Sequence, residues 1–173
     1  TSRAVVIDSI ANEFVDRIIE RAKKFKLGDG SDARTDIGPS VDEKQFNTVL
    51  KYIDIGREDG AELLTGGRRA SGDGLENGYF VEPTVFDKVT PDMRIAREEI
   101  FGPVLSVLAF DTEEEAVALA NSTVYGFAAG VFTQNLARAH RMTRKVRAGV
   151  VWVNTYRAVS PVAPFGGNGL TGH

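Results

Sequence analysis

The residues with the clearest chemical potential stand together just before an apolar run. Glu98, Glu99 and Phe101 precede Val104–Phe110, and a Gly-Pro pair between them marks an abrupt change of backbone direction. A carboxylate can accept hydrogen bonds from a vicinal diol, and a phenyl face can cover a flat heteroaromatic ring. The alternative is structural, with a solvated glutamate pair and a phenylalanine in the core. The residues by themselves leave both interpretations open.

A second group of candidates follows the apolar run Val150–Val153. Residues 154–157 read Asn-Thr-Tyr-Arg, and residues 158–173 contain Pro, Gly and Phe165 without a helical or strand period. In an open parallel sheet, ligands bind beyond the carboxyl ends of the strands. A long irregular stretch inside a domain is usually functional or disordered. The alternative is a surface loop that Phe165 pins to the protein.

Hydrophobic periodicity predicts the elements that must position these residues. The predicted strands are 4–7, 61–65, 79–85, Val104–Phe110, 127–132 and Val150–Val153. The first predicted helix is capped by Asp8 or Ser9 and ended by Gly28, and the others run from 41 to about 58, from 112 to 120, and from 136 to 146. Pro83 places the strand 79–85 at a sheet edge, because proline cannot donate to a ladder. Thr112 and Glu115 have the spacing of a capping box.

The order of these elements predicts the fold class. The last three strands and their helices form β-α-β-α-β, which favours one parallel sheet with right-handed crossovers. The chain has 173 residues, of which 42% are hydrophobic and 26% are charged. These values are ordinary for a globular domain with a core of its own. We therefore predict a single α/β domain over 1–173, a three-layer parallel sheet with helices on both faces, incomplete at its ends.

Composition also excludes several classes of function. The net charge of −3, with both signs mixed along the chain, argues against a nucleic-acid partner despite a basic cluster at 138–147. No apolar run is long enough to span a bilayer, and no signal peptide is recognisable. The absence of cysteine excludes disulfides and cysteine metal sites, and only His140 and His173 are left for zinc. We expect a cytoplasmic protein without a bound metal and without a membrane partner.

Five motifs in order identify a resemblance that covers nearly the whole chain. They are Gly38-Pro39 before a helix with Gln45-Phe46, Gly78-Tyr79-Phe80-Val81-Glu82-Pro83-Thr84, Glu98-Glu99-Ile100-Phe101-Gly102-Pro103, Tyr125-Gly126-Phe127-Ala128-Ala129-Gly130-Val131-Phe132, and Trp152-Val153-Asn154 with Pro164-Phe165-Gly166-Gly167. Together they resemble the NAD(P)-dependent aldehyde dehydrogenase superfamily, whose catalytic domain is α/β.

The resemblance implies a cofactor, NAD or NADP, and residues that bind it. It places Glu99 on the hydroxyls of the nicotinamide ribose and Phe101 against the nicotinamide ring. Gln45 matches a family position near the same ribose, although the lysine often found three residues later is Thr48 here. Glu98, the neighbour of Glu99, is expected to be structural.

The resemblance also implies a tunnel for a small-molecule aldehyde. Asn154, Tyr156, Arg157, Val159 and Phe165 are expected to line it, with Phe165 as an aromatic wall and Val159 as an apolar one. Arg157 could pair with a carboxylate on the far end of a semialdehyde. The alternative for Arg157 is a solvated side chain or a surface ion pair.

The family oxidises aldehydes through a cysteine thiolate, a thiohemiacetal and a thioester, yet this chain contains no cysteine. Thr1-Ser2-Arg3 resembles the segment just after that cysteine, and Leu170-Thr171-Gly172-His173 lies where the family continues into a tail that joins subunits. We therefore expect an inactive C-terminal portion of an enzyme, with no catalytic residue of its own, from a homodimer or homotetramer. The alternatives are a non-catalytic oligomerisation or partner-binding module and a coenzyme A-acylating relative.

Overall fold

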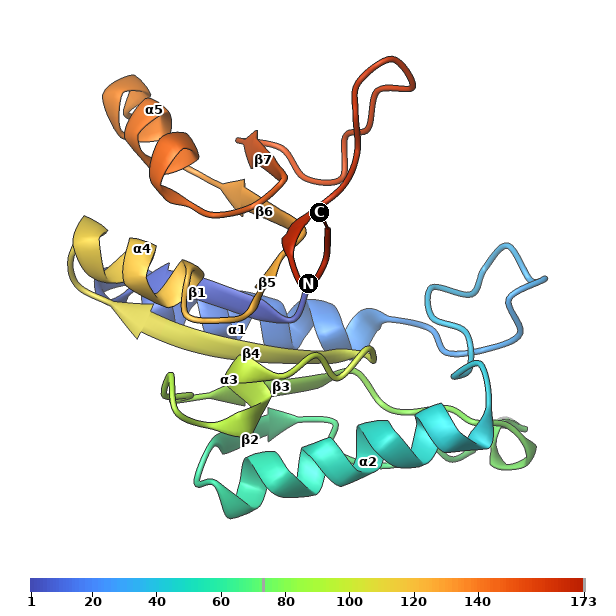
Figure 1. Cartoon of the computed structure of the whole chain (residues 1–173). Helices are drawn as coiled ribbons and strands as arrows, with labels where there is room; N and C mark the ends of the chain where they lie inside the picture. The colour runs from blue at the N-terminus through green and yellow to red at the C-terminus, as the bar shows by residue number, and fades with distance from the viewer. Residues whose placement is uncertain (73, 173) are drawn as a thin grey trace. The chain divides into compact units, whose positions relative to one another are not determined.

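A four-stranded mixed sheet organises residues Thr1–Asp111, the first of the two units into which the chain divides. The computed structural model describes residues 1–72 and 74–172. The strands lie in the order β1 (Arg3–Ile7), β4 (Val104–Phe110), β3 (Thr84–Asp87) and β2 (Glu62–Thr65) (Figure 1). β1 and β3 run parallel to β4, whereas β2 runs antiparallel to β3. The predicted α/β class is confirmed, and the sheet of this unit is mixed because of β2.

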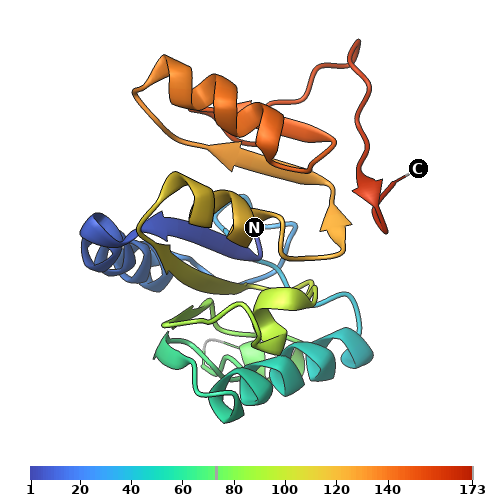
Figure 2. The ribbon, with the colours of Figure 1, turned by 60° about the vertical axis from the view of Figure 1, so that its left-hand side comes forward.

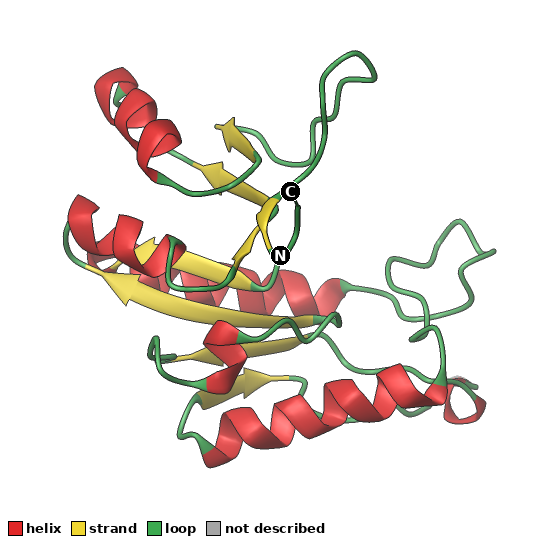
Figure 3. Cartoon of the chain, in the orientation of Figure 1, coloured by secondary structure: helices red, strands yellow, loops and turns green. Residues whose placement is uncertain are grey.

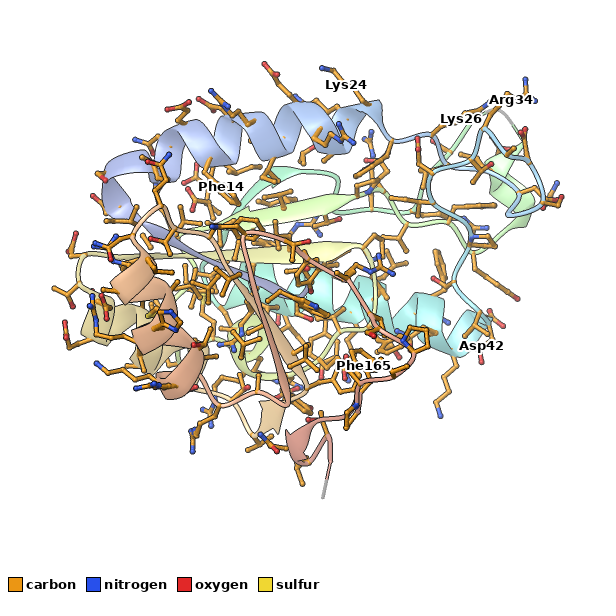
Figure 4. The ribbon with its side chains drawn as sticks, turned by 90° about the horizontal axis from the view of Figure 1, so that it is seen from above. Phe14, Lys24, Lys26, Arg34, Asp42 and Phe165 are labelled. Atoms are coloured by element: carbon orange, nitrogen blue, oxygen red, sulfur yellow. The ribbon has the colours of Figure 1, made fainter. Side chains whose placement is uncertain are left out.

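Helices cover both faces of this sheet because successive strand residues point to opposite sides. Val85 and Val107 pack against α1 (Asp8–Lys24), and Figure 4 shows Phe14 directed from α1 toward the strands. The next residue of β3, Phe86, faces the other way, toward α2 (Glu43–Glu58). Figure 4 shows α1 on one side of the strands and α2 on the other.

The second unit, Thr112–His173, has two helices and two small strand pairs among its described residues. Its elements are α4 (Glu113–Ala120), β5 (Tyr125–Gly126), β6 (Ala128–Val131), α5 (Leu136–Lys145), β7 (Val150–Val153) and β8 (Asn168–Gly169). β6 and β7 pair in parallel and β5 pairs antiparallel with β8. α5 packs on the β6–β7 pair, as Figure 2 shows.

An ion-pair cluster joins the two helices of the second unit. Arg141 donates to both oxygens of the Glu113 carboxylate at 2.8 and 2.7 Å, and Arg138 donates to it at 3.4 Å. These guanidinium groups, Arg141 first, lower the pKa of Glu113 to about 2. Asn121 adds a second connection, because its amide bonds the carbonyl of Lys145 and the backbone N–H of Arg147.

The predicted ends of the first helix were wrong on both sides. α1 begins at Asp8 with Ile7 as its N-cap, and no side chain caps it. It ends at Lys24 because Phe25 leaves the helical region, with φ −67° and ψ 128°. Gly28 instead bonds the carbonyl of Ile37. By contrast, the predicted cap at Thr112 is confirmed, since its hydroxyl accepts from Glu115 N at 3.2 Å.

Two predictions about strand pairing were also wrong. β3 begins after Pro83, so the proline lies outside the ladder, and β3 is central rather than at an edge. β4 pairs with β1 on one edge and with β3 on the other, whereas β6 and β7 pair with each other. Local patterns identified these strands but not the strands with which they pair.

Over the described part of the chain, no helix is long and apolar enough to cross a membrane.

Candidate functional site

A pocket of about 540 Å³ opens at the amino ends of β1 and β4 in the first unit. Because these strands are parallel, their first residues meet at one edge of the sheet, where Ser106 N donates to Ser2 O at 3.0 Å. The loop before α2 and the turn before β4 close the pocket. Its lining includes Thr1, Ser2, residues 37–41, Gln45, Val81 and residues 99–104.

The chemistry of this pocket is mostly apolar with few polar groups. Ile37, Val41, Val81 and Val104 contribute aliphatic surface, and among the described lining residues Glu99 supplies the one side-chain carboxylate. Such a lining suits a flat, weakly polar ring next to hydroxyl groups, because the apolar wall takes the ring and the carboxylate accepts hydrogen bonds. The predicted cofactor residues Glu99, Phe101 and Gln45 all line it.

Phe101 occupies an unusual position on the rim of this pocket. Its φ is +56°, a left-handed conformation that non-glycine residues adopt rarely. Its side chain is 79% exposed although an apolar ring normally lies inside. An exposed ring on a strained backbone is a local conflict of the type found at ligand sites.

Gln45 holds this strained turn through its side-chain amide. Its Nε2 donates to the carbonyl of Ile100 at 2.9 Å and to the carbonyl of Phe101 at 3.0 Å. α2 presents Gln45 at this place because Asp42 caps the helix, accepting from Gln45 N at 2.7 Å. Thr48, one turn later, donates its hydroxyl back to Lys44 O at 2.8 Å.

Glu98 and Glu99 differ sharply although they are neighbours. Glu98 accepts two hydrogen bonds from Arg94, at 3.0 and 2.9 Å, and one from the Tyr52 hydroxyl at 2.5 Å. The Arg94 guanidinium, followed by Tyr52, lowers the pKa of Glu98 to about 2, and the bond to Glu98 raises the pKa of Tyr52. Glu99 is exposed, and no bond of its carboxylate is found among the described residues. Glu98 is thus engaged within the protein, while Glu99 is available to a ligand.

In the second unit, Asn154 connects the ends of two strands. Its side-chain oxygen accepts from Thr133 N at 2.8 Å and its amide donates to Thr133 O at 2.9 Å. Its own N–H donates to the carbonyl of Val131 at 2.8 Å, and its φ is +53°. These bonds direct the Asn154 amide toward the segment after β6.

The other predicted tunnel residues lie on the irregular segment that Figure 3 shows as loop. Tyr156 meets Trp152 edge to face, with ring centroids 5.2 Å apart, and the Trp152 indole N–H donates to Ala158 O at 2.7 Å. Arg157 has φ +62° and is exposed, as is Val159. The two rings therefore anchor the start of the segment.

Phe165, labelled in Figure 4, lies further along the same segment. Its ring meets Phe127 edge to face, at 5.0 Å between centroids. The structure thus brings the predicted tunnel residues onto one loop, where Tyr156 and Phe165 each contact a different aromatic partner. Whether they line a substrate tunnel stays a prediction.

Sequence reasoning missed several residues around the first-unit pocket. Tyr52 and Arg94 were not identified as partners of Glu98, and Thr1, Ser2 and Val81 were not identified as pocket residues. The signal for Tyr52 was its spacing, since it lies seven residues after Gln45 and therefore on the same face of a helix.

No group of three or more His, Asp or Glu suited to a metal ion occurs among the described residues.

Comparison with known proteins assigns the chain to a family. A model of the aldehyde dehydrogenase family matches residues 1–173. The chain belongs to the aldehyde dehydrogenase family, as the five sequence motifs predicted.

Similar curated proteins are about three times as long as this chain. A betaine aldehyde dehydrogenase of Mesorhizobium japonicum is 50% identical over 166 residues, which are 96% of this chain and 34% of that protein. A (Z)-2-((N-methylformamido)methylene)-5-hydroxybutyrolactone dehydrogenase of Acinetobacter baylyi is 49% identical over 173 residues, which are 99% of this chain and 35% of that protein. The chain therefore spans about a third of the curated relatives that it matches.

Solved structures agree with the fold. Betaine aldehyde dehydrogenase of Staphylococcus aureus in complex with NAD+ is 41% identical, with a TM-score of 0.94 over 97% of this chain and 33% of that chain. An aldehyde dehydrogenase of Bacillus cereus is 46% identical, with a TM-score of 0.91 over 97% of this chain and 33% of that chain. The predicted cofactor, NAD or NADP, is confirmed at the level of the family.

Proposed function

We propose that this chain contributes the nicotinamide half of a cofactor site, and part of a substrate tunnel, to an enzyme that oxidises aldehydes to carboxylic acids with NAD(P)+. The observation that carries the proposal is the pocket in which Glu99 and Phe101 stand together, one carboxylate and one exposed ring on an otherwise apolar wall. Family membership supports the same assignment.

Each pocket residue has a separate proposed role. The Glu99 carboxylate accepts hydrogen bonds from the two hydroxyls of the nicotinamide ribose, since it is exposed and its described surroundings leave it available. Phe101 lays its ring against the nicotinamide and restricts its orientation. When bound, the cofactor supplies an acceptor for hydride.

The acyl chemistry proposed for the whole enzyme needs a group that this chain does not contain. A cysteine thiolate adds to the aldehyde carbon and forms a thiohemiacetal, hydride leaves that carbon, and water hydrolyses the resulting thioester to the acid. Because the chain has no cysteine, we propose that it does not oxidise aldehydes by itself.

For the substrate we propose a small aldehyde that contacts the segment of residues 154–165. Tyr156 and Phe165 supply aromatic walls, Val159 supplies an apolar one, and Asn154 orders the start of the segment through Thr133. Arg157 is a candidate for the carboxylate of a semialdehyde. We also propose that the whole enzyme is a cytoplasmic homodimer or homotetramer.

The test compares the protein expressed from its whole coding sequence with the 173-residue chain alone. With propanal and NAD+ or NADP+, reduced cofactor should form only in the first sample, which would also reveal the preferred cofactor. Turnover by the isolated chain would refute the proposed division of roles. No turnover by the whole protein, together with binding to a partner chain, would favour a non-catalytic module. A thioester product formed only when coenzyme A is added would favour an acylating relative.

A further inference from the structure

One face of α2 follows the segment of residues 94–102 from end to end. The residues on this face are Gln45, Val49, Tyr52 and Gly56, and the C-cap Asp59 continues it; these five are hereafter the α2 stripe. Their spacing of 4, 3, 4 and 3 residues keeps them on one side of a helix with 3.6 residues per turn. The whole stripe lies within the first unit.

The amino-terminal half of the α2 stripe holds the turn that carries the pocket residues. Gln45 donates to the carbonyls of Ile100 and Phe101. Val49 packs so closely on Gly102 that a methyl group added there would lie 2.5 Å from Val49 Cγ2. The glycine therefore allows the close approach of turn and helix.

The carboxyl-terminal half holds the beginning of the same segment. Tyr52 donates to the Glu98 carboxylate. A methyl group added at Gly56 would lie 3.1 Å from Ile95 Cδ1, and Asp59 accepts from Arg94 N at 2.9 Å. The stripe and the segment thus run in roughly opposite directions, with contacts near both ends and at Glu98.

The described contacts of the α2 stripe do not involve the side chains of Glu99 and Phe101, the two groups proposed to touch the cofactor. Its bonds go to Glu98 and to backbone groups, and none that the structure describes goes to the Glu99 carboxylate. The Phe101 ring is exposed in the same way. The stripe therefore orders the backbone on both sides of Glu99 while the functional groups stay available.

We propose that the α2 stripe is a positioning surface for the cofactor site, with Gln45 acting through the backbone of Phe101 and not as a direct ribose ligand. This inference rests on the proposed function, since it takes Glu99 and Phe101 as the groups that touch the cofactor. It assigns to Gln45 and Tyr52 the role of maintaining the left-handed backbone at Phe101, which relaxes without them.

Three substitutions of Gln45 separate the two roles, in the protein expressed from its whole coding sequence. Gln45→Met keeps the length and loses both donors, Gln45→Glu keeps an oxygen acceptor and loses the donors, and Gln45→Lys restores a donor. Asn47→Ala is the matched control, because it removes an amide from an exposed position on the same helix. Tyr52→Phe removes only the hydroxyl that donates to Glu98, and Tyr79→Phe is its matched control.

Two measurements read the outcome, and one needs no cofactor. The dissociation constant for NADH comes from a fluorescence titration. Chymotrypsin cleavage after Phe101, in the cofactor-free protein, measures how often the turn opens, and cleavage after the fully buried Phe86 serves as the reference for general unfolding. Melting temperatures identify any variant that fails to fold.

We expect Met and Glu at position 45 to raise the dissociation constant about tenfold and to speed cleavage after Phe101 by a similar factor. Lys should retain most of the affinity, Tyr52→Phe should lose about threefold, and both controls should match the wild type. Normal affinity with Glu but not with Lys would make Gln45 a direct ligand and overturn the proposal. Unchanged cleavage after Phe101 in both Gln45→Met and Tyr52→Phe would also overturn it.

The two measurements keep this inference distinct from the proposed function. A wild-type protein that does not bind NADH refutes the proposed function and, with it, the cofactor role of the stripe. The cleavage rates then still decide whether the stripe holds the Phe101 turn.

Discussion

The strands of the two units differ in how deeply they are buried. In the first unit, Ser106 and Val107 of β4 are 0% exposed, and Phe86 of β3 is as well. In the second unit, all four residues of β7 are half-buried, and β6 also has none that is fully buried. The candidate cofactor residues therefore stand on a packed scaffold. The candidate substrate residues depend on local contacts.

This difference separates two ways of positioning a site. Around Glu99, a helix contacts the segment along its length, and the sheet behind it is closely packed. Around residues 154–165, single contacts order the chain, such as Asn154 with Thr133 and Phe165 with Phe127. Substitutions in the first region should act over the whole unit, and those in the second should stay local.

The largest expected effect tests the packing itself. Phe86→Ala should lower the free energy of unfolding by about 3–5 kcal/mol, because it removes a fully buried ring and leaves a cavity. The matched variant Phe132→Ala in the second unit, where the ring is 70% exposed, should change it by less than about 0.5 kcal/mol. Urea denaturation followed by circular dichroism measures both. Equal losses would contradict the comparison.

The second prediction concerns the ligand groups on the packed scaffold, in the protein expressed from its whole coding sequence. Glu99→Gln should weaken NADH binding by about 1.5–3 kcal/mol, because it removes a charge-assisted hydrogen bond. Phe101→Ala should weaken it by about 0.5–1.5 kcal/mol beyond the loss of ring contact area. NADH titration and melting curves should show loss of binding without loss of stability, with Glu58→Gln on α2 as a neutral control. If both variants melt at a lower temperature than the wild type but bind NADH normally, Glu99 and Phe101 are structural residues.

The third prediction examines the loop of the second unit. If Arg157 pairs with a substrate carboxylate, Arg157→Ala should lower kcat/KM for a semialdehyde about tenfold or more and spare propanal, because one charged hydrogen bond contributes about 1.5–3 kcal/mol. Arg144→Ala, at an exposed position of α5, provides the control for lost charge. Steady-state kinetics with both aldehydes decides the question. Equal losses on both substrates, or none, would exclude the carboxylate role.

The smallest expected effect is a decrease in the free energy of unfolding at low pH, to which one carboxylate in each unit contributes. Glu98 and Glu113 each have a pKa of about 2, below the ordinary value of 4.5, because of Arg94 and Tyr52 in one unit and Arg141 in the other. A lowered pKa means that the stabilisation is present above the ordinary value and is lost as the pH falls from 4.5 toward 2.

Urea unfolding at about pH 7 and about pH 3 measures this dependence. Glu98→Gln and Glu113→Gln should each flatten it slightly, because exposed ion pairs contribute little. Glu58→Gln should leave the wild-type slope in place. A steep change for Glu98→Gln alone would show that the Tyr52–Arg94 cluster is more strongly coupled to folding than its exposure indicates.

Features encoded by neighbouring residues were predicted well. The Thr112 cap depends on a residue three positions away, and the helix from Glu43 to Glu58 follows from its apolar spacing. The strand Val150–Val153 was predicted with its observed bounds. The ends of α1 were not predicted, because its N-cap, Ile7, has no side chain that can cap a helix, and the helix stops without a glycine. Pro83 was taken as a mark of an edge, although the ladder simply starts after it.

By itself, the sequence determined the α/β class, the family and the candidate pair Glu99 and Phe101, because periodicity and short motifs are local properties of the chain. Only the tertiary structure decided that Gln45 bonds the carbonyl of Ile100, 55 residues away, and that Tyr52 bonds Glu98, 46 residues away. It also decided that β4 pairs with β1 and β3 and not with the strands that follow it. Such partners are chosen by the packing of whole helices and strands, for which no local spacing contains the information.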